Sequence, residues 1–340
     1  MILAGDIGGT KCNLALFAAE ESALRVFFKR RYRTRDFTSF EQLIEQFRQD
    51  AAVQEAALAG RRIVAAGFGA AGTIVGDCVY TNNLPWGIRA STLAQILELH
   101  PEEVALINDL AATAAGVQLL PVKDLVVLNE GVSQPGRNKA LLAAGTGLGE
   151  VILFWDGEKH RIAASEGGMA DFAARTEREI WLLSCMRMRL PHVSCEEVLS
   201  GRGFRAIHEC LAPDVRHATF DLLAPDSALE ITTLALAGSC KACVETLDLW
   251  TEAYGAEAGN LALRVLAYGG IYIAGGIAPK ILPKMLDGTF VRAFCDKALL
   301  HDVLSRIPIY IVRNEDAPLW GAAHEAFSRT NRKSSQLAAR

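Results

Sequence analysis

Three apolar, strand-like segments of this chain each end in a cluster of glycines, and this recurring pattern constrains the fold more than any other feature. They are residues 1–11 (MILAGDIGGTK), 141–149 (LLAAGTGLG) and 271–280 (IYIAGGIAPK). Glycine has no Cβ, so such turns let the backbone approach an anion and direct its N–H groups inward. None of the three is a Walker loop or a dinucleotide fingerprint, and a strand followed by Gly-Gly can also be a plain hairpin. Their recurrence favours turns that together enclose one nucleotide.

Two acids stand where such a site needs them. Asp6 lies at the end of the first strand, just before the turn, where a carboxylate can hold water around a Mg²⁺ ion. Residues 104–112 (VALINDLAA) indicate a strand that delivers Asn108 and Asp109 to the start of an alanine-rich helix. A carboxylate in that place can serve as a general base. Asp109 can also be the N-cap of a helix that begins at Leu110, and the two roles are compatible.

The order of these motifs resembles that of the bacterial glucokinases, in the superfamily of hexokinase, Hsp70 and actin, and the resemblance covers nearly the whole chain. It implies an α/β, two-lobed, actin-like (ribonuclease H-like) ATPase fold with an interlobe cleft. The glycine turns match the family's two phosphate loops and its adenosine-side turn. The cofactors implied are ATP and Mg²⁺, the latter held by Asp6 through water. The implied ATP-binding residues are Gly8, Gly9, Thr10, Lys11, Gly145, Thr146, Gly147, Gly275 and Gly276.

The same resemblance implies a sugar site and a reaction. Asn108 and Asp109 match the family's sugar-binding Asn and catalytic Asp, and residues 166–172 (EGGMADF) match its sugar loop. Residues 81–86 (TNNLPW) match the loop beneath the sugar, although an ordinary turn explains them equally well. The implied substrate-binding residues are Asn82, Asn83, Asn108, Glu166, Met169 and Glu196. The implied reaction is ATP-dependent phosphorylation of glucose at its 6-hydroxyl, which gives glucose 6-phosphate and ADP, with Asp109 as the base.

Two positions in this sugar site leave alternatives open. Residues 194–197 (SCEE) have the form of a capping box, in which Glu197 reaches back to the cap at Ser194 and Glu196 is left free for a ligand. The alternative for Glu196 is a solvated acid favoured by the helix dipole. Met169 stands where the family has His, and a thioether accepts hydrogen bonds weakly and donates none. A kinase for another hexose therefore remains an alternative to glucokinase.

A third hypothesis is a non-catalytic, sugar-responsive binding protein on the same fold. Asp6, Asp109 and the three glycine turns argue against it, because a pure binder needs no base. A net charge of −4 and a pI near 6.0 give no basic footprint for nucleic acid. No uncharged apolar stretch has the length of a membrane span, and residues 1–4 lack the features of a signal peptide.

Length and cysteine usage complete the expectations. At 340 residues, two lobes are expected: a small one of residues 1–119 with 318–340, and a large one of residues 120–317. Eight scattered cysteines fit reduced thiols in the cytoplasm better than a disulfide framework. The lone C-x-x-C at 240–243 has no second pair and no nearby His cluster in the sequence, which disfavours zinc. The family suggests a homodimer.

Overall fold

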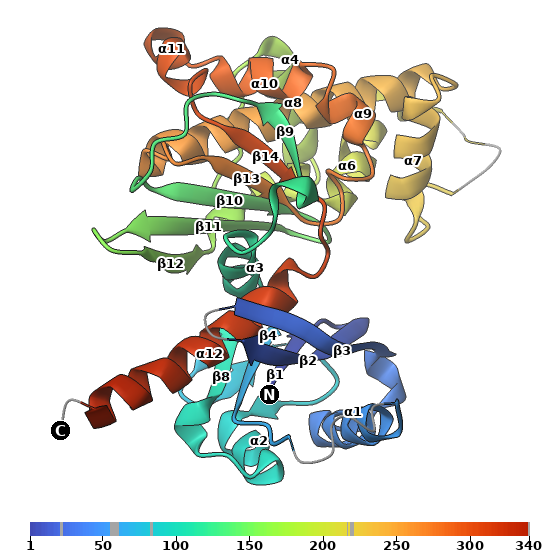
Figure 1. Ribbon diagram of the computed structural model, residues 1–340. Coiled ribbons are helices and arrows are strands. Elements are labelled where there is room, and N and C mark those ends of the chain that lie inside the picture. The colour runs from blue at the N-terminus through green and yellow to red at the C-terminus, as the bar shows by residue number, and fades with distance from the viewer. Residues whose placement is uncertain (21–22, 55–60, 82–83, 216, 218–220, 339–340) are drawn as a thin grey trace. The chain divides into compact units, whose positions relative to one another are not determined.

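The computed structural model describes residues 1–20, 23–54, 61–81, 84–215, 217 and 221–338 (Figure 1). The chain divides into two compact units. Unit 1 comprises Met1–Leu120 and Asn314–Arg340, and unit 2 comprises Pro121–Arg313. Each unit is built on its own main sheet. Among the helices of the described part of the chain, none has the length and apolar character needed to cross a membrane.

The main sheet of unit 1 has five strands in the order β3-β2-β1-β4-β8. Its strands are β1 (Ile2–Ile7), β2 (Lys11–Glu20), β3 (Ala23–Arg33), β4 (Ala65–Ala70) and β8 (Val104–Asn108). The strands β1, β2 and β3 pair antiparallel in sequence, whereas β4 runs parallel to both β1 and β8. The carboxyl ends of β1, β4 and β8 therefore lie at one edge of the sheet, the edge at which α/β sheets bind ligands.

Helices cover both faces of this sheet because successive side chains of a strand point to opposite sides. Along β1, Ile2 and Ala4 pack in one buried cluster with α12 (Ala317–Ala338). Leu3 and Ile7 pack in another with α1 (Phe40–Gln54) and α2 (Ala90–Leu97). Helix α3 (Asp109–Val117) contacts both α12 and β4. The remaining elements of unit 1 are the small sheet β5 (Thr73–Val75), β6 (Cys78–Tyr80) and β7 (Ile88–Arg89), and the 3₁₀ helices Thr34–Asp36 and Pro101–Glu103.

Unit 2 repeats the sheet topology of unit 1 and adds one strand. Its order is β12-β11-β10-β13-β14-β9, with β10, β11 and β12 antiparallel in sequence and β13 parallel to β10 and β14. The strands are β9 (Leu125–Asn129), β10 (Lys139–Ala144), β11 (Leu148–Trp155), β12 (His160–Ser165), β13 (Ile271–Ala274) and β14 (Ile309–Val312). The first glycine turn lies between β1 and β2, and the second lies at the same topological point, between β10 and β11.

Unit 2 is richer in helices than unit 1, and its core packs around the long helix α8 (Figure 1). The α-helices are α4 (Glu177–Arg187), α5 (Cys195–Val198), α6 (Gly201–Leu211), α7 (Ser227–Leu236), α8 (Lys241–Val265), α9 (Leu282–Met285), α10 (Thr289–Cys295) and α11 (His301–Leu304). The 3₁₀ helices are Val122–Asp124, Gly167–Met169 and Ala298–Leu300. Trp250 and Tyr254 of α8 are fully buried, and Trp250 stacks on Phe204 of α6.

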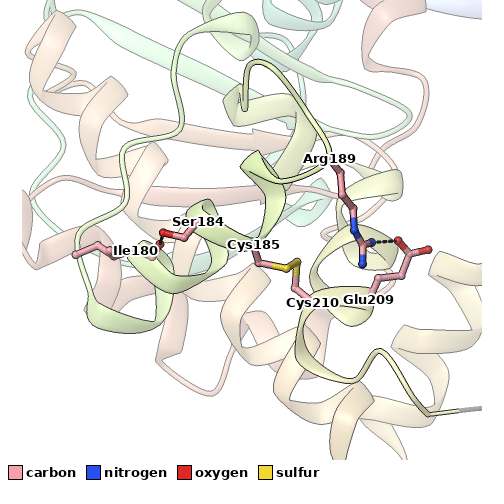
Figure 2. Close-up of a disulfide and its surroundings, with 6 residues drawn as sticks. All are labelled: Ile180, Ser184, Cys185, Arg189, Glu209 and Cys210. Atoms are coloured by element: carbon pink, nitrogen blue, oxygen red, sulfur yellow. Dashed lines mark hydrogen bonds and ion pairs between the residues drawn. A yellow bond between two sulfur atoms is a disulfide. The ribbon is translucent and has the colours of Figure 1, made fainter.

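A disulfide joins α4 to α6, which corrects the expectation that all eight cysteines are reduced. Cys185 and Cys210 are linked with their Cα atoms 6.1 Å apart (Figure 2). An ion pair of 2.7 Å between Arg189 and Glu209 lies beside it. The two cysteines are 25 residues apart, so local sequence gave no indication that α4 and α6 pack together.

Apolar spacing in the sequence predicts strands at 2–5, 12–17 and 26–33 and a helix through Phe40, Leu43 and Phe47, and all of these elements are present. Residues 63–68 are predicted as a strand followed by a loop at 69–72, but residues 69–70 complete β4 because they pair with β1 and β8. A helix is predicted directly after the turn at 275–276, whereas the chain makes further turns and α9 begins at Leu282. The C-terminal helix, predicted at roughly 318–330, spans Ala317–Ala338.

Candidate active site

The first glycine turn is an exposed loop held from behind by a buried threonine. The Gly8 N–H donates to the Lys11 carbonyl at 3.0 Å, which closes the turn. The Thr34 hydroxyl donates to the Gly8 carbonyl at 2.6 Å, and the Thr34 N–H donates to the Thr10 carbonyl at 3.1 Å. Thr34 is fully buried, whereas Gly9 and Thr10 are exposed. The backbone is thus fixed on its inner side and open on its outer side, as a phosphate-binding turn requires.

Asp6 lies on β1 at the ligand-binding edge of the sheet. The Asn13 amide donates to its carboxylate at 3.0 Å, and Arg31 in turn donates to the Asn13 carbonyl at 3.0 Å. Burial raises the pKa of Asp6, the Asn13 hydrogen bond opposes this, and the negative charge of Asp109 raises the pKa further. A carboxylate destabilised in this way gains from a nearby cation, so the donor fits Mg²⁺. The Lys11 ammonium, predicted to bind ATP, lies 3.4 Å from Glu315.

The start of α3 assigns the capping role to Asn108 and not to Asp109. The Asn108 side-chain oxygen accepts from the N–H groups of Leu110 and Ala111 at 3.0 and 3.2 Å, and its amide donates to the Gly72 carbonyl at 3.2 Å. Asp109 is the first residue of α3, so the helix begins one position earlier than the start at Leu110 that we predicted. Its carboxylate accepts from the Leu110 N–H at 3.0 Å. Burial raises the pKa of Asp109, which suits a proton acceptor.

Backbone-to-backbone packing of α3 on α12 fixes the position of Asp109. A Cβ built on Gly116 would lie 1.7 Å from the Ala317 carbonyl oxygen, and one built on Gly321 would lie 1.8 Å from the Ala112 carbonyl oxygen. Only glycine fits at either contact, because no side chain there can move aside. The C-terminal helix of the chain thus holds the helix that begins with the candidate base.

The second and third glycine turns meet at a cavity of about 710 Å³ within unit 2. Gly145, Thr146 and Gly276 line it, together with residues of α6, α7 and the turn before α9. The Gly201 N–H donates to the Gly145 carbonyl at 2.8 Å, which ties the start of α6 to the second turn. Gly275 has a φ of +85°, and a Cβ on it would lie 2.2 Å from the Ala144 carbonyl oxygen, so this turn requires glycine.

This cavity also contains cations that the sequence analysis missed. Arg202 and Arg205 of α6 and Lys280 line it, and they suit the phosphates of a nucleotide. The available signal was the Ser-Gly-Arg-Gly segment at 200–203, because a helix that begins with glycines and a cation resembles other anion-binding helix starts. Gly147 belongs to the second glycine turn. A Cβ built on Gly147 would lie 2.4 Å from the Glu196 carboxylate.

Glu196 is not free, contrary to our expectation. Its carboxylate accepts from the Leu148 N–H at 3.0 Å, at the end of the second turn, and pairs with Arg202 at 2.6 Å. Glu197 was expected to reach back to the helix cap, but its carboxylate also contacts Arg202, at 3.1 Å. Ser194 does cap α5, since its hydroxyl accepts from the Glu197 N–H. The structure therefore brings Glu196 to the second glycine turn and to Arg202.

The predicted sugar loop is exposed. Glu166 precedes the 3₁₀ helix Gly167–Met169, whose closing bond runs from the Met169 N–H to the Glu166 carbonyl at 2.9 Å. The Met169 residue is 51% exposed, so it is not part of the core. Asp171 pairs with His192 at 2.6 Å. Asn82 and Asn83 lie outside the described residues.

The comparisons with known proteins agree with these features. The glucokinase family model matches residues 3–329. A glucokinase from Nostoc sp. is 37% identical over 95% of this chain and 98% of its own length. A glucokinase from Yersinia pestis is 35% identical over 94% of each chain.

Solved structures show the same fold. A glucokinase from an Antarctic psychrotroph has a TM-score of 0.84 and 29% identity, and covers 96% of this chain and 98% of its own. A glucokinase from Balamuthia mandrillaris, solved in complex with glucose, has a TM-score of 0.77 and 20% identity over 96% and 93% of the two chains. A ROK family glucokinase from Streptomyces griseus, solved with glucose and AMPPNP, has a TM-score of 0.60 and 19% identity over 96% and 99%. The predicted actin-like ATPase fold is confirmed, and the chain belongs to the glucokinase family.

Proposed function

We propose that Asp109 is the general base of this chain's reaction, in which the γ-phosphate of ATP passes to the 6-hydroxyl of glucose. The reaction itself, ATP-dependent glucose phosphorylation, is that of the family. The observation that carries the role of Asp109 is its position at the carboxyl end of β8, where Asn108 relieves it of capping the helix. Its carboxylate would accept the 6-hydroxyl proton as that oxygen attacks phosphorus.

Sugar binding is proposed for a second group of residues. The second N–H of the Asn108 amide, whose first donates to the Gly72 carbonyl, would donate to one hydroxyl of the sugar. The exposed Glu166 carboxylate would accept from others, and charged acceptors form the stronger hydrogen bonds. Met169, at the exposed end of the same short helix, would contact the sugar through its thioether. Asn82 and Asn83 keep the sugar-binding role that the family resemblance implies.

Within unit 2 the cavity would bind ATP, and within unit 1 the first glycine turn would bind phosphate; each by itself offers what a nucleotide needs. The cavity combines the backbone of two glycine turns with Arg202, Arg205 and Lys280. The turn at residues 8–11 offers the exposed backbone of Gly9 and Thr10 and the Thr10 hydroxyl. Glu196 would order the second turn for the phosphates, which is supported by its bond from the Leu148 N–H. A sugar contact for Glu196 is the competing role.

Mg²⁺ is proposed as the metal, held by Asp6 through water. When bound, it would neutralise charge on the phosphates of ATP. What supports Asp6 is a carboxylate whose charge is disfavoured by burial and by Asp109, and whose orientation is fixed by Asn13. We further propose that units 1 and 2 are the small and large lobes, that the protein acts in the cytoplasm, and that it forms a homodimer.

The substitution Asp109→Asn tests the base. It preserves the shape of the side chain and removes the proton acceptor, so kcat should fall at least about 100-fold, as is typical for general bases. The dissociation constant of glucose and the unfolding temperature should change little. The matched control is Asp302→Asn, which alters an exposed acid in the first turn of α11. An Asp109→Asn variant that keeps more than a tenth of the wild-type turnover would exclude this role.

A further inference from the structure

Unit 2 contains a compact group of metal-ligating side chains, away from the residues assigned above. His208 of α6, His217 of the following segment and Cys243 of α8 place one ligand atom each within 4.8 Å of the other two. The Nε2 atoms of the two histidines are 2.9 Å apart. His208 and Cys243 are fully buried. Nothing in the proposed reaction uses this group.

The hydrogen bonds around His208 prepare its Nε2 atom to bind a cation. The Thr246 hydroxyl donates to the Ala242 carbonyl at 2.8 Å, so towards His208 its oxygen acts as the acceptor. His208 Nδ1 lies 3.1 Å from this oxygen and donates to it. The proton of neutral His208 is thereby placed on Nδ1, which leaves the Nε2 lone pair directed at the group. An outer hydrogen bond of this kind fixes the tautomer and ring orientation of metal-binding histidines.

A second thiol lies at the start of the same helix as Cys243. Cys240 is the N-cap of α8, and Cys243 lies in its first turn. The spacing is C-x-x-C, which provides two thiolates in many structural zinc sites. No His cluster lies near this pair in the sequence. Folding supplies the histidines, since α6 packs against α8.

We propose that His208, His217, Cys240 and Cys243 bind a zinc ion. Two imidazole nitrogens and two thiolates form a borderline-soft, tetrahedral donor set that suits Zn²⁺ over the hard cations Mg²⁺ and Ca²⁺. Four protein ligands fill the tetrahedron, so the site is structural and offers no position for a substrate. In a tetrahedral zinc site neighbouring donor atoms are roughly 3.3–3.8 Å apart. The ligand atoms of His208, His217 and Cys243, which lie within 4.8 Å of one another, therefore need to adjust by about 1 Å or less, and the Cys240 side chain turns towards them when the ion binds.

The ion would join α6 to α8 at the end of α6 opposite the nucleotide cavity. The first residues of α6 line that cavity, and His208 lies near the other end of the helix, which spans Gly201–Leu211. The disulfide at Cys210 ties the same end of α6 to α4. Zinc would therefore stabilise the helix that carries the cationic side chains of the cavity.

Cobalt binding provides a direct test, because tetrahedral Co²⁺ with thiolate ligands absorbs visible and near-ultraviolet light. The full chain, free of any histidine tag and handled under argon without a reductant so that the Cys185–Cys210 disulfide stays intact, is stripped with a chelator, dialysed and titrated with Co²⁺ and then Zn²⁺. We expect about one equivalent of Co²⁺ with thiolate charge-transfer absorption, its displacement by Zn²⁺, and a rise in unfolding temperature with Zn²⁺.

Variants identify the ligands. Cys243→Ser should abolish the charge-transfer absorption, and His217→Gln, at a partly exposed position, should weaken Co²⁺ binding at least tenfold. Thr246→Val, which removes only the partner of His208, should weaken it about 10- to 100-fold. The matched controls are Cys295→Ser, at a buried free thiol of α10, and His192→Gln. If folded wild-type protein takes up less than half an equivalent, or if the controls lose as much binding as the ligand variants, the histidine pair is a hydrogen bond only and the proposal is wrong.

Discussion

The two contacts of Glu196 predict what the substitution Glu196→Gln does. One carboxylate oxygen accepts from the Leu148 N–H at 3.0 Å, and the other accepts from Arg202 at 2.6 Å. Glutamine keeps one acceptor oxygen and replaces the other with an amide that donates, so one of the two contacts becomes donor against donor. Losing a hydrogen bond to a charged group costs about 1.5–3 kcal/mol. At 25 °C this corresponds to about a 10- to 150-fold effect.

The effect should appear in the KM for ATP, because Leu148 ends the second glycine turn and Arg202 lines the cavity. Steady-state kinetics with ATP varied at saturating glucose, and the reverse, separate the two constants. Glu197→Gln is the matched control, since Glu197 also contacts Arg202 but bonds no backbone of the turn. A large rise in the KM for glucose with an unchanged KM for ATP would refute this reasoning and restore the sugar contact that we first expected.

Three further predictions concern a buried acid, a helix contact and the exposed methionine. Burial and a neighbouring carboxylate raise the pKa of Glu150 to about 7, so the folded state binds the Glu150 proton more tightly than the unfolded state. The free energy of unfolding that this proton contributes is lost as the pH rises from about 4.5 to about 7. Glu150→Gln should therefore flatten the dependence of urea stability on pH between these values. Gly321→Ala should lower the free energy of unfolding by about 1–3 kcal/mol through overpacking. Gly87→Ala should not, because nothing lies within 4 Å of the place where its Cβ would stand. Met169→His should lower the KM for glucose, and an unchanged KM for glucose and every other hexose in a panel would show that this position does not contact the sugar.

Local sequence predicts the strands and turns that carry the site, because their signals are short-range. The strand before the first turn alternates faces, with Ile2 and Ala4 on one side and Leu3 on the other, and both faces are covered. A Gly-Gly pair after such a strand limits the backbone to a turn. The family resemblance then supplies the roles of these turns, and the fold that it implied is confirmed.

Contacts between distant segments could not be predicted in this way. Glu196 and Leu148 are 48 residues apart, and only the packing of α5 beneath the second turn brings them together. At the start of α3 the ambiguity was local: Asn and Asp are both good caps, and adjacent residues compete for the same N–H groups. The bond from Asn108 to the Gly72 carbonyl, 36 residues away, provides a further anchor for the Asn108 side chain.

The two units share a sheet topology, yet their sequences divide the chemistry between them. In unit 1, Asp6 faces Asn13 across the hairpin one step before the turn. The corresponding pair in unit 2 is Ala143 and Gly149, which has no carboxylate. Unit 2 instead places arginines and a lysine beside its turns. The carboxylate that it does bring to the second turn, that of Glu196, is paired with Arg202. A carboxylate repels a bound phosphate unless a cation neutralises one of the two charges. Acids therefore suit unit 1, which is proposed to hold Mg²⁺ and the base. Cations suit unit 2, whose cavity is proposed to hold the nucleotide. An Ala143→Asp substitution should therefore weaken ATP binding, because it places the acid of unit 1 in unit 2 without the asparagine that orients it.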